Sequence, residues 1–172
     1  MKLGSEGLAL IRSFETFCPH VYDDAKPMVK GRYPEWQGGV VRGELTIGYG
    51  HTEAAGPPKI TRGLRMTADE ALAVLEHDMD AVEADVNRVV TLPLTQAQFD
   101  ALCSFHFNCY GLILRNGKPS TCCRVLNDGN RIGGMDELER WNKAQGVICP
   151  GLTRRRAAER ALFEGRDWRE FA

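Results

Sequence analysis

Residues 45–52 read LTIGYGHT, a short β-type run that ends in glycine-rich backbone. Glycines in such a run let a ligand or another chain segment approach closely. The run is not a phosphate-binding loop, because no GK[ST] helix start follows it. It closes a longer segment, residues 19–56, in which seven glycines separate short runs such as GVVRG. This pattern predicts a small lobe of β-hairpins.

Helical patterns flank the glycine-rich segment on both sides. Ser5 and the apolar positions behind it predict a helix over residues 5–16. Two capping boxes, Thr67–Glu70 and Thr95–Gln98, open longer helices that we expect to run to about residues 90 and 107. Shorter helices are predicted at about 120–127, 134–143 and 152–164.

These elements predict an α+β, mainly α, fold with a small β-hairpin lobe and a larger helical lobe. We expect a single domain, residues 1–172, with a β-lobe at about 19–56 and a helical lobe at about 60–172 plus the N-terminal helix. A ligand cleft is expected between the two lobes. The hydrophobic content of 43% and the charged content of 26% fit a globular chain.

Charge and hydropathy exclude several classes of partner. The formal net charge of −1 favours neither nucleic acid nor an anionic membrane as a bulk electrostatic partner. No apolar run reaches the length of a membrane span, and residues 1–15 lack the apolar core of an export signal.

The cysteines are expected to be free thiols, several of them buried, because no export signal precedes them. Three disulfides are the alternative reading. No C-x-x-C pair of the zinc-ribbon kind is present, so neither a metal nor a cofactor is predicted. The six positions are Cys18, Cys103, Cys109, Cys122, Cys123 and Cys149.

Three acidic residues near the first helix are candidates for chemistry. Glu15 falls at the C-terminal end of that helix, where the macrodipole disfavours the charged form of a carboxyl and so suits a general acid. Asp23 and Asp24 follow, and a pair of carboxyls is what glycoside hydrolysis requires. Taken one at a time, Glu15 is better explained as a surface glutamate, and Asp23 and Asp24 as an Asx-type turn.

Taken together, Glu15, Asp24 nine residues later and the T-x-G-x-G-H run form a specific constellation. It resembles the phage-type lysozymes, glycoside hydrolase family 24, as found in endolysins of tailed phages. The resemblance implies a lysozyme-like fold with the active-site cleft between the two lobes. Matching stretches follow in the same order along residues 5–165. They are GLALIRSFETF, VYDDA, LTIGYGHT, LTQAQFDAL, SFHFN, WNKA and PGLTRRRAAERALF.

The resemblance implies a peptidoglycan hydrolase that cleaves the β-1,4 bond between N-acetylmuramic acid and N-acetylglucosamine. Glu15 matches the general acid of the family. Asp24 and Thr46 would position the attacking water or stabilise positive charge, while Tyr22 and Tyr49 would shape the site. The family precedent favours inversion, which requires the two carboxyls to lie about 6.5–9.5 Å apart.

Other matches carry weaker expectations. Phe107 and Asn108 match a substrate-binding pair of the family, although a helix C-cap explains Asn108 nearly as well. Trp141 is expected in the core. The run Arg154–Arg156 is expected on a solvated face, with one member able to pair with Glu15 or an acidic neighbour.

His51 is a further residue of the matching run LTIGYGHT. We expect His51 to be a structural hydrogen bonder, with Asp78 as its partner, rather than a base.

One segment departs from the family pattern. The family joins its aspartate to its threonine by a tight turn, whereas here 21 residues intervene, AKPMVKGRYPEWQGGVVRGEL. This insert could form an extra hairpin, a cleft wall or a lid. It also leaves open whether Asp23 or Asp24 is the functional aspartate, and the nine-residue spacing from Glu15 favours Asp24.

The expected partner is peptidoglycan, with no nucleic acid and no membrane span, and the expected state is a monomer. An endolysin would stay in the host cytoplasm, need a holin for access, and act on periplasmic peptidoglycan. Three alternatives remain: a lytic transglycosylase, a non-catalytic peptidoglycan-binding module, and a cysteine hydrolase built on Cys18 or Cys103.

Overall fold

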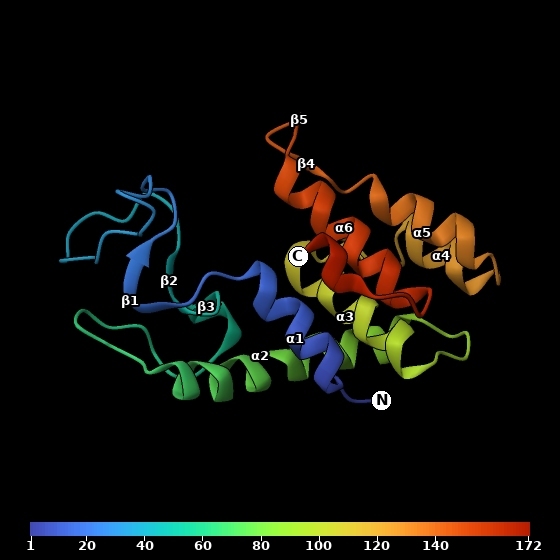
Figure 1. The fold of residues 1–172 in the computed structure, drawn as a ribbon. Helices are drawn as coiled ribbons and strands as arrows, with labels where there is room; N and C mark the ends of the chain where they lie inside the picture. The colour runs from blue at the N-terminus through green and yellow to red at the C-terminus, as the bar shows by residue number, and fades with distance from the viewer. The chain divides into compact units, whose positions relative to one another are not determined.

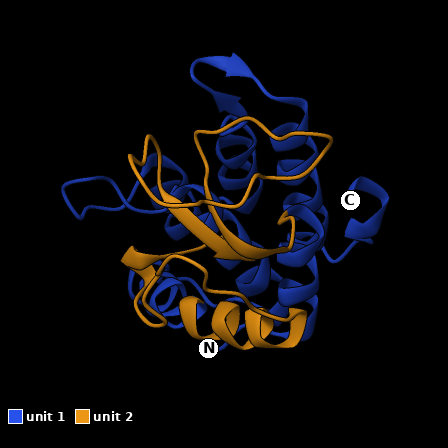
Figure 2. Ribbon diagram, turned by 90° about the vertical axis from the view of Figure 1, so that its left-hand side faces the viewer, with its two compact units in different colours: residues 1–14, 79–172 blue, residues 15–78 orange.

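The computed structural model describes all residues, 1–172 (Figure 1). The fold is mainly helical with a small antiparallel sheet, as the sequence predicts. The chain divides into two compact units, one made of residues 15–78 and the other of residues 1–14 and 79–172 (Figure 2). No helix combines the length and the apolar content that a membrane crossing requires.

The unit of residues 15–78 is organised around a three-stranded antiparallel sheet in the order β1-β2-β3. The strands are β1 (Cys18–Asp23), β2 (Leu45–Gly48) and β3 (His51–Thr52). Gly48 and Gly50 adopt positive φ in the turn between β2 and β3. A Cβ on Gly48 would also lie 3.1 Å from the Ala71 side chain, so the sheet packs closely on the helix that follows.

That helix is α2 (Ala68–Val89), preceded by the short 3₁₀ turn η1 (Glu53–Ala55). The capping box at its start is confirmed. The backbone N–H of Glu70 donates to Thr67 Oγ1 at 3.2 Å, and the backbone N–H of Thr67 donates to Glu70 Oε2 at 2.8 Å. Two orphan donors of the helix start are thereby satisfied.

The run GVVRG, residues 39–43, does not form the strand that its composition suggested. Gly38 and Gly39 both have positive φ, at 96° and 92°, and Val40 is 86% exposed. A strand needs a neighbour to bond its backbone and a face to bury, and this run has neither. Residues 25–44 instead form an irregular loop that begins and ends at the edge of the sheet.

The other unit packs its helices around α3 (Gln96–Cys109), which contacts α1 (Ser5–Phe14) and α6 (Pro150–Phe163). The capping box at Thr95 is confirmed. Asp100 on α3 is buried, and its carboxylate accepts from the backbone N–H groups of Gly4 and Gly7 at 2.8 and 3.2 Å. This bond set fixes the start of α1 on α3.

The remaining elements of that unit are α4 (Thr121–Asn127), α5 (Arg131–Glu139) and η2 (Trp168–Phe171). Helix α5 begins three residues earlier than predicted, because Asn130 caps it by accepting from Gly133 N at 2.9 Å. It also ends earlier, at Glu139.

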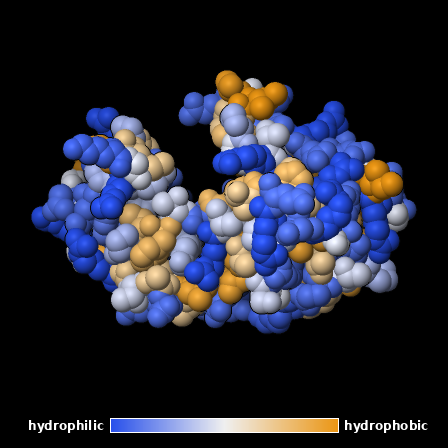
Figure 3. All heavy atoms as spheres, in the orientation of Figure 1, coloured by the Kyte–Doolittle hydropathy of each residue, from blue (hydrophilic) through white to orange (hydrophobic).

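A hairpin that the sequence analysis missed follows α5. Strands β4 (Lys143–Ala144) and β5 (Val147–Ile148) pair through a turn at Gln145 and Gly146, both of which have positive φ. Such a two-residue turn matches the twist of a hairpin. Val147 and Ile148 are mostly exposed, and the hairpin forms a hydrophobic tip at the upper edge of Figure 3.

All six cysteines are free, as expected, and four of them are buried. They act as small apolar side chains in the packing of their units.

Candidate active site

The sheet brings several of the predicted site residues together in the unit of residues 15–78. Tyr22 pairs with Thr46 across β1 and β2, and Thr46 pairs with Thr52 across β2 and β3. The ladder continues past β1, because Asp24 N donates to Glu44 O at 3.1 Å. Directly opposed residues share a face, so Tyr22 and Thr46 lie on one face of the sheet, and Asp24 follows just past the end of β1.

Tyr22 connects this face to Glu15. Its ring is buried and stacks on Tyr33, with the ring centroids 4.1 Å apart and an angle of 16° between the planes. Burial raises the pKa of Tyr22, and the neighbouring Tyr33, Cys18, Glu15 and Asp24 raise it further. The Tyr22 hydroxyl therefore stays protonated at neutral pH, within the electrostatic reach of both candidate carboxyls.

The two adjacent aspartates have different environments. Asp23 has no exposed surface, and its carboxylate accepts from the backbone N–H groups of Arg42 at 2.9 Å, Gly43 at 2.9 Å and Ala25 at 3.2 Å. The bond from Arg42, with those from Gly43 and Ala25, lowers the pKa of Asp23. Asp24 is exposed, and of this pair it is the carboxyl that faces solvent.

Asp23 ties the two ends of the loop together. Its bonds reach Ala25 at the start of the loop and Gly43 near the end, while Glu44 N donates to Asp24 Oδ1 at 2.6 Å. The insert of 21 residues therefore enters and leaves the sheet at one point. This closure brings Thr46 back beside Tyr22 despite the long sequence separation.

Glu15 is half-buried and directly follows α1, which ends one residue earlier, at Phe14. Tyr49 lies in the turn between β2 and β3, is largely buried, and packs against Phe17 with the ring centroids 5.4 Å apart. Glu15 and Tyr49 both belong to the unit of residues 15–78.

Phe107 and Asn108 lie in the other unit, in the last turn of α3. The C-cap of α3 is Tyr110, with φ of 51°, so Asn108 is not the cap. Arg156 donates to Asn108 Oδ1 at 2.8 Å. Because a guanidinium can only donate, this bond fixes the amide and leaves Asn108 Nδ2 to donate elsewhere.

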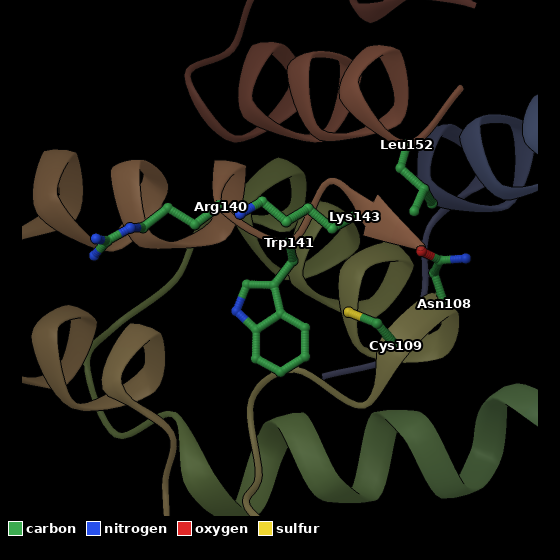
Figure 4. Close-up of a pocket in the computed structure, with 6 residues that line it drawn as sticks. All are labelled: Asn108, Cys109, Arg140, Trp141, Lys143 and Leu152. Carbon is green, nitrogen blue, oxygen red and sulfur yellow. The ribbon is translucent and has the colours of Figure 1, made fainter. Parts of the chain in front are cut away.

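Asn108 also lines a pocket of about 430 Å³ within its unit (Figure 4). Figure 4 shows the sulfur of Cys109 and the indole of Trp141 turned toward one another. The expectation that Trp141 is a core residue is wrong, since it is 42% exposed. It follows the end of α5 and meets Phe105 only edge-on, with the ring centroids 5.9 Å apart. The other lining residues are Arg140, Lys143 and Leu152.

The basic run of α6 is not the solvated face that was expected, but the expected pairing with an acidic neighbour is present. Arg155 and Arg156 are buried, and both pair with the fully buried Glu159. Ser104 donates to the same carboxylate at 2.8 Å. Only Arg154 of the run is exposed, because Glu159 lies one helical turn further on and draws the other two inward.

His51 is a structural hydrogen bonder, as expected. Its Nδ1 bonds to Asp78 Oδ2 at 2.8 Å and its Nε2 bonds to Pro58 O at 3.0 Å. All three groups belong to the unit of residues 15–78. With both ring nitrogens engaged and the ring buried, His51 has no free nitrogen to act as a base.

The cysteine-hydrolase alternative does not fit the thiols. Cys18 is buried and its Sγ donates to His20 O at 3.3 Å, while Cys103 has no exposed surface. Burial raises the pKa of both thiols. A nucleophilic cysteine needs the opposite shift and some exposure. No group of three or more His, Cys, Asp or Glu side chains is arranged to hold a metal ion.

Comparison with known proteins identifies the family. The sequence profile of the Phage lysozyme family matches residues 12–159. The chain belongs to the phage lysozyme family. It is 33% identical over 168 residues to the endolysin of Acyrthosiphon pisum secondary endosymbiont phage 1, covering 95% of this chain and 99% of that protein.

Solved structures agree with this assignment. A P22 lysozyme mutant aligns with a TM-score of 0.72 and 31% identity, over 95% of this lysozyme and 99% of that chain. The muramidase domain of SpmX from Asticaccaulis excentricus aligns with a TM-score of 0.71 and 30% identity, over 94% of this chain and 97% of that domain. This lysozyme is therefore a glycoside hydrolase that acts on peptidoglycan.

Three residues that matter in this site escaped the sequence analysis. Asp23 was seen only as a rival of Asp24, and the loop closure that it provides depends on backbone groups about 20 positions away. Tyr33 and Gly43 belong to the insert, for which the family offers no matching motif. No local signal in the sequence marks these contacts, because each joins residues that are well separated along the chain.

Proposed function

We propose that this lysozyme cleaves the β-1,4 bond between N-acetylmuramic acid and N-acetylglucosamine by general acid catalysis from Glu15. The observation that carries this proposal is the register of the sheet, which pairs Tyr22 with Thr46 just before Asp24, while Glu15 lies in the same unit, three residues before β1 begins. A glycosidase needs two such carboxyls on one surface, one to protonate the leaving oxygen and one to act on the opposite side of the sugar ring.

Asp24 and Thr46 complete the catalytic set in this proposal. Asp24 is exposed and lies two residues past Tyr22, the strand partner of Thr46, so in this proposal its carboxylate and the Thr46 hydroxyl act on one water molecule. They activate that water or stabilise the positive charge that develops at the anomeric carbon. Tyr22 and Tyr49 shape the surrounding surface.

Phe107 and Asn108 are proposed to bind substrate, because they match a substrate-binding pair of the family. Because Asn108 Oδ1 accepts from Arg156, the Nδ2 group of Asn108 remains as a donor, and it suits a carbonyl oxygen of an N-acetyl group. We expect Asn108→Asp to weaken substrate binding, because the replacement removes the donor.

Single substitutions test the catalytic assignment. Glu15→Gln and Asp24→Asn should each lower kcat on purified peptidoglycan by at least about 100-fold, the scale of a lost acid or base. Asp24→Asn also separates hydrolysis from transglycosylation, because a transglycosylase uses no water and tolerates the change better. A fully active Glu15→Gln would contradict the proposal.

The biological setting is proposed from the endolysins among the relatives. We expect a monomer that stays in the host cytoplasm and reaches periplasmic peptidoglycan once a holin opens the inner membrane. Expression in a Gram-negative host should then cause little lysis alone and rapid lysis after a membrane permeabiliser is added. Rapid lysis without the permeabiliser would contradict the holin requirement.

A further inference from the structure

The insert builds a wall beside the proposed catalytic face. Tyr33 stacks on Tyr22, and its backbone carbonyl accepts a hydrogen bond from His20 Nε2 at 3.0 Å. Further along the insert, Trp36 N donates to Val21 O at 2.7 Å. The insert is therefore fixed along the outer edge of β1, opposite the edge that pairs with β2.

Fixing the insert in this way encloses a pocket of about 400 Å³. One side is the segment that directly follows Glu15, and the other is the tight turn where Val29 and Arg32 bond each other's backbones. The size falls within the range of about 300–1,000 Å³ that is typical of small-molecule sites. The lining residues are Thr16, Phe17, Cys18, Pro19, His20, Gly31, Arg32 and Tyr33.

We propose that this pocket is a substrate subsite for a sugar residue of the wall glycan that carries a carboxylate substituent. The proposal rests on the proposed function, because it extends the catalytic face through the stacked pair of Tyr22 and Tyr33. Tyr33 is then a specificity-determining residue that the insert contributes.

The chemistry of the lining supports this choice of ligand. Phe17, Pro19 and Tyr33 offer apolar surfaces to the C–H face and the methyl groups of an N-acetylated sugar. Arg32 is exposed at the rim and offers a fork of N–H donors that fits a carboxylate. The loop also carries more basic than acidic residues, Lys26, Lys30, Arg32 and Arg42 against Glu35 and Glu44, which favours an anionic ligand.

Two soluble glycans of equal length separate the apolar contribution from the charged one. The first is a peptidoglycan strand freed of its peptides by an amidase, so that each muramic acid keeps a free lactyl carboxylate. The second is a chitooligosaccharide, which has the same linkage and N-acetyl groups but no carboxylate. Binding is measured by calorimetry in the full-length Glu15→Gln chain, so that neither glycan is consumed.

Tyr33→Ala should weaken binding of both glycans by about tenfold, and Tyr33→Phe should restore it, because the ring makes the contact. Arg32→Gln should weaken binding of the carboxylate-bearing strand by about threefold at low salt and leave the chitooligosaccharide unchanged. Val40→Ala, at an exposed position of the same loop that does not line the pocket, is the matched control and should bind as the parent does.

Unchanged binding in Tyr33→Ala would overturn the subsite, and equal weakening of both glycans in Arg32→Gln would overturn the carboxylate preference. A backbone NMR titration of the Glu15→Gln chain guards against a folding defect in Tyr33→Ala. Saturating strand should shift the amide signals of residues 16–18, 20 and 31–33, and no shift there would overturn the subsite. Hydrolysis by the unsubstituted enzyme is scored separately, so an inactive enzyme contradicts the proposed function instead.

Discussion

Gly43 leaves free the space that the Asp24 carboxylate occupies. A Cβ at position 43 would overlap Asp24 Oδ1 and would lie 2.8 Å from the Cβ of Ala25. The φ of Gly43 is not positive, so it is this close approach, rather than the backbone conformation, that requires a glycine. The position of the proposed catalytic aspartate thus depends on the small size of a residue 19 positions along the chain.

Gly43→Ala should therefore lower activity by moving Asp24. We expect kcat on peptidoglycan to fall by about tenfold or more, since a small misplacement of a catalytic group can cost up to about 100-fold. Steady-state kinetics on solubilised peptidoglycan checks this. Val41→Ala, two positions away in the same loop, is the control and should keep its activity. If Gly43→Ala were as active as Val41→Ala, the role of this contact would be refuted.

Asp23→Asn should loosen the loop closure and change how stability depends on pH. The native hydrogen bonds lower the pKa of Asp23, so its contribution to stability is present above its ordinary pKa and is lost as pH falls through the folded value. An asparagine has one acceptor oxygen and would turn an N–H group toward a backbone donor. The variant should melt at a lower temperature at pH 7, and the difference should shrink toward pH 2.

Thermal melts of both proteins across that pH range measure the effect. A difference in melting temperature that stays constant down to pH 2 would argue against an ionised Asp23 as the closing group. Glu44→Gln is a suitable control, because the Glu44 backbone makes the contacts in this region and its side chain is exposed.

The buried pair of His51 and Asp78 should contribute strongly to stability. Both ring nitrogens of His51 face acceptors, the carboxylate of Asp78 and the carbonyl of Pro58, and all three groups lie in one unit. Removing one partner leaves a buried group uncompensated, at a cost of about 3–5 kcal/mol. His51→Asn should lower the free energy of unfolding in urea by that amount.

A double-mutant cycle with Asp78→Asn isolates the coupling between the two residues. The double variant should be less destabilised than the sum of the two single variants. Strict additivity would show that the pair contributes only through packing.

His106 should make the protein less stable in mild acid. It has no exposed surface, its Nε2 bonds to Asp85 at 3.2 Å, and its Nδ1 has no partner. Burial lowers the pKa of His106, with the Asp85 carboxylate opposing the shift. As pH falls below about 6.5, His106 takes up a proton in the unfolded chain before it does so in the folded protein. The free energy of unfolding therefore falls from that pH down to the folded pKa of His106.

Urea unfolding of the wild type and of His106→Gln between pH 7.5 and 5 measures this contribution. The wild type should lose stability over this range, and His106→Gln, which cannot titrate, should lose less. The same pH dependence in both proteins would assign the loss to other groups.

Local signals in the sequence predicted much of the fold. The capping boxes at Thr67 and Thr95 set the starts of two helices, since each uses residues only three positions apart. The run GVVRG and the hairpin at 143–148 both place valine beside glycine, yet only the second forms strands. The second run has its partner strand across a two-residue turn, whereas the first has none within reach.

Local motifs also predicted part of the candidate site. Tyr22 and Thr46 were found from motifs, and the sheet register pairs them. Long-range contacts were missed, because nothing near Asp23 in the sequence signals its bonds to Arg42 and Gly43. The burial of Arg155 and Arg156 had a local signal in Glu159, which the sequence analysis did not use.

The central claim is that Glu15 protonates the glycosidic oxygen while water completes the cleavage. Mass spectrometry of the soluble fragments released from purified peptidoglycan tests it most directly, with Glu15→Gln beside the wild type. The account predicts saccharides that end in reducing N-acetylmuramic acid, absent with the variant. Anhydro-muramic ends, cut peptides on intact glycan strands, or equal release by Glu15→Gln would contradict it.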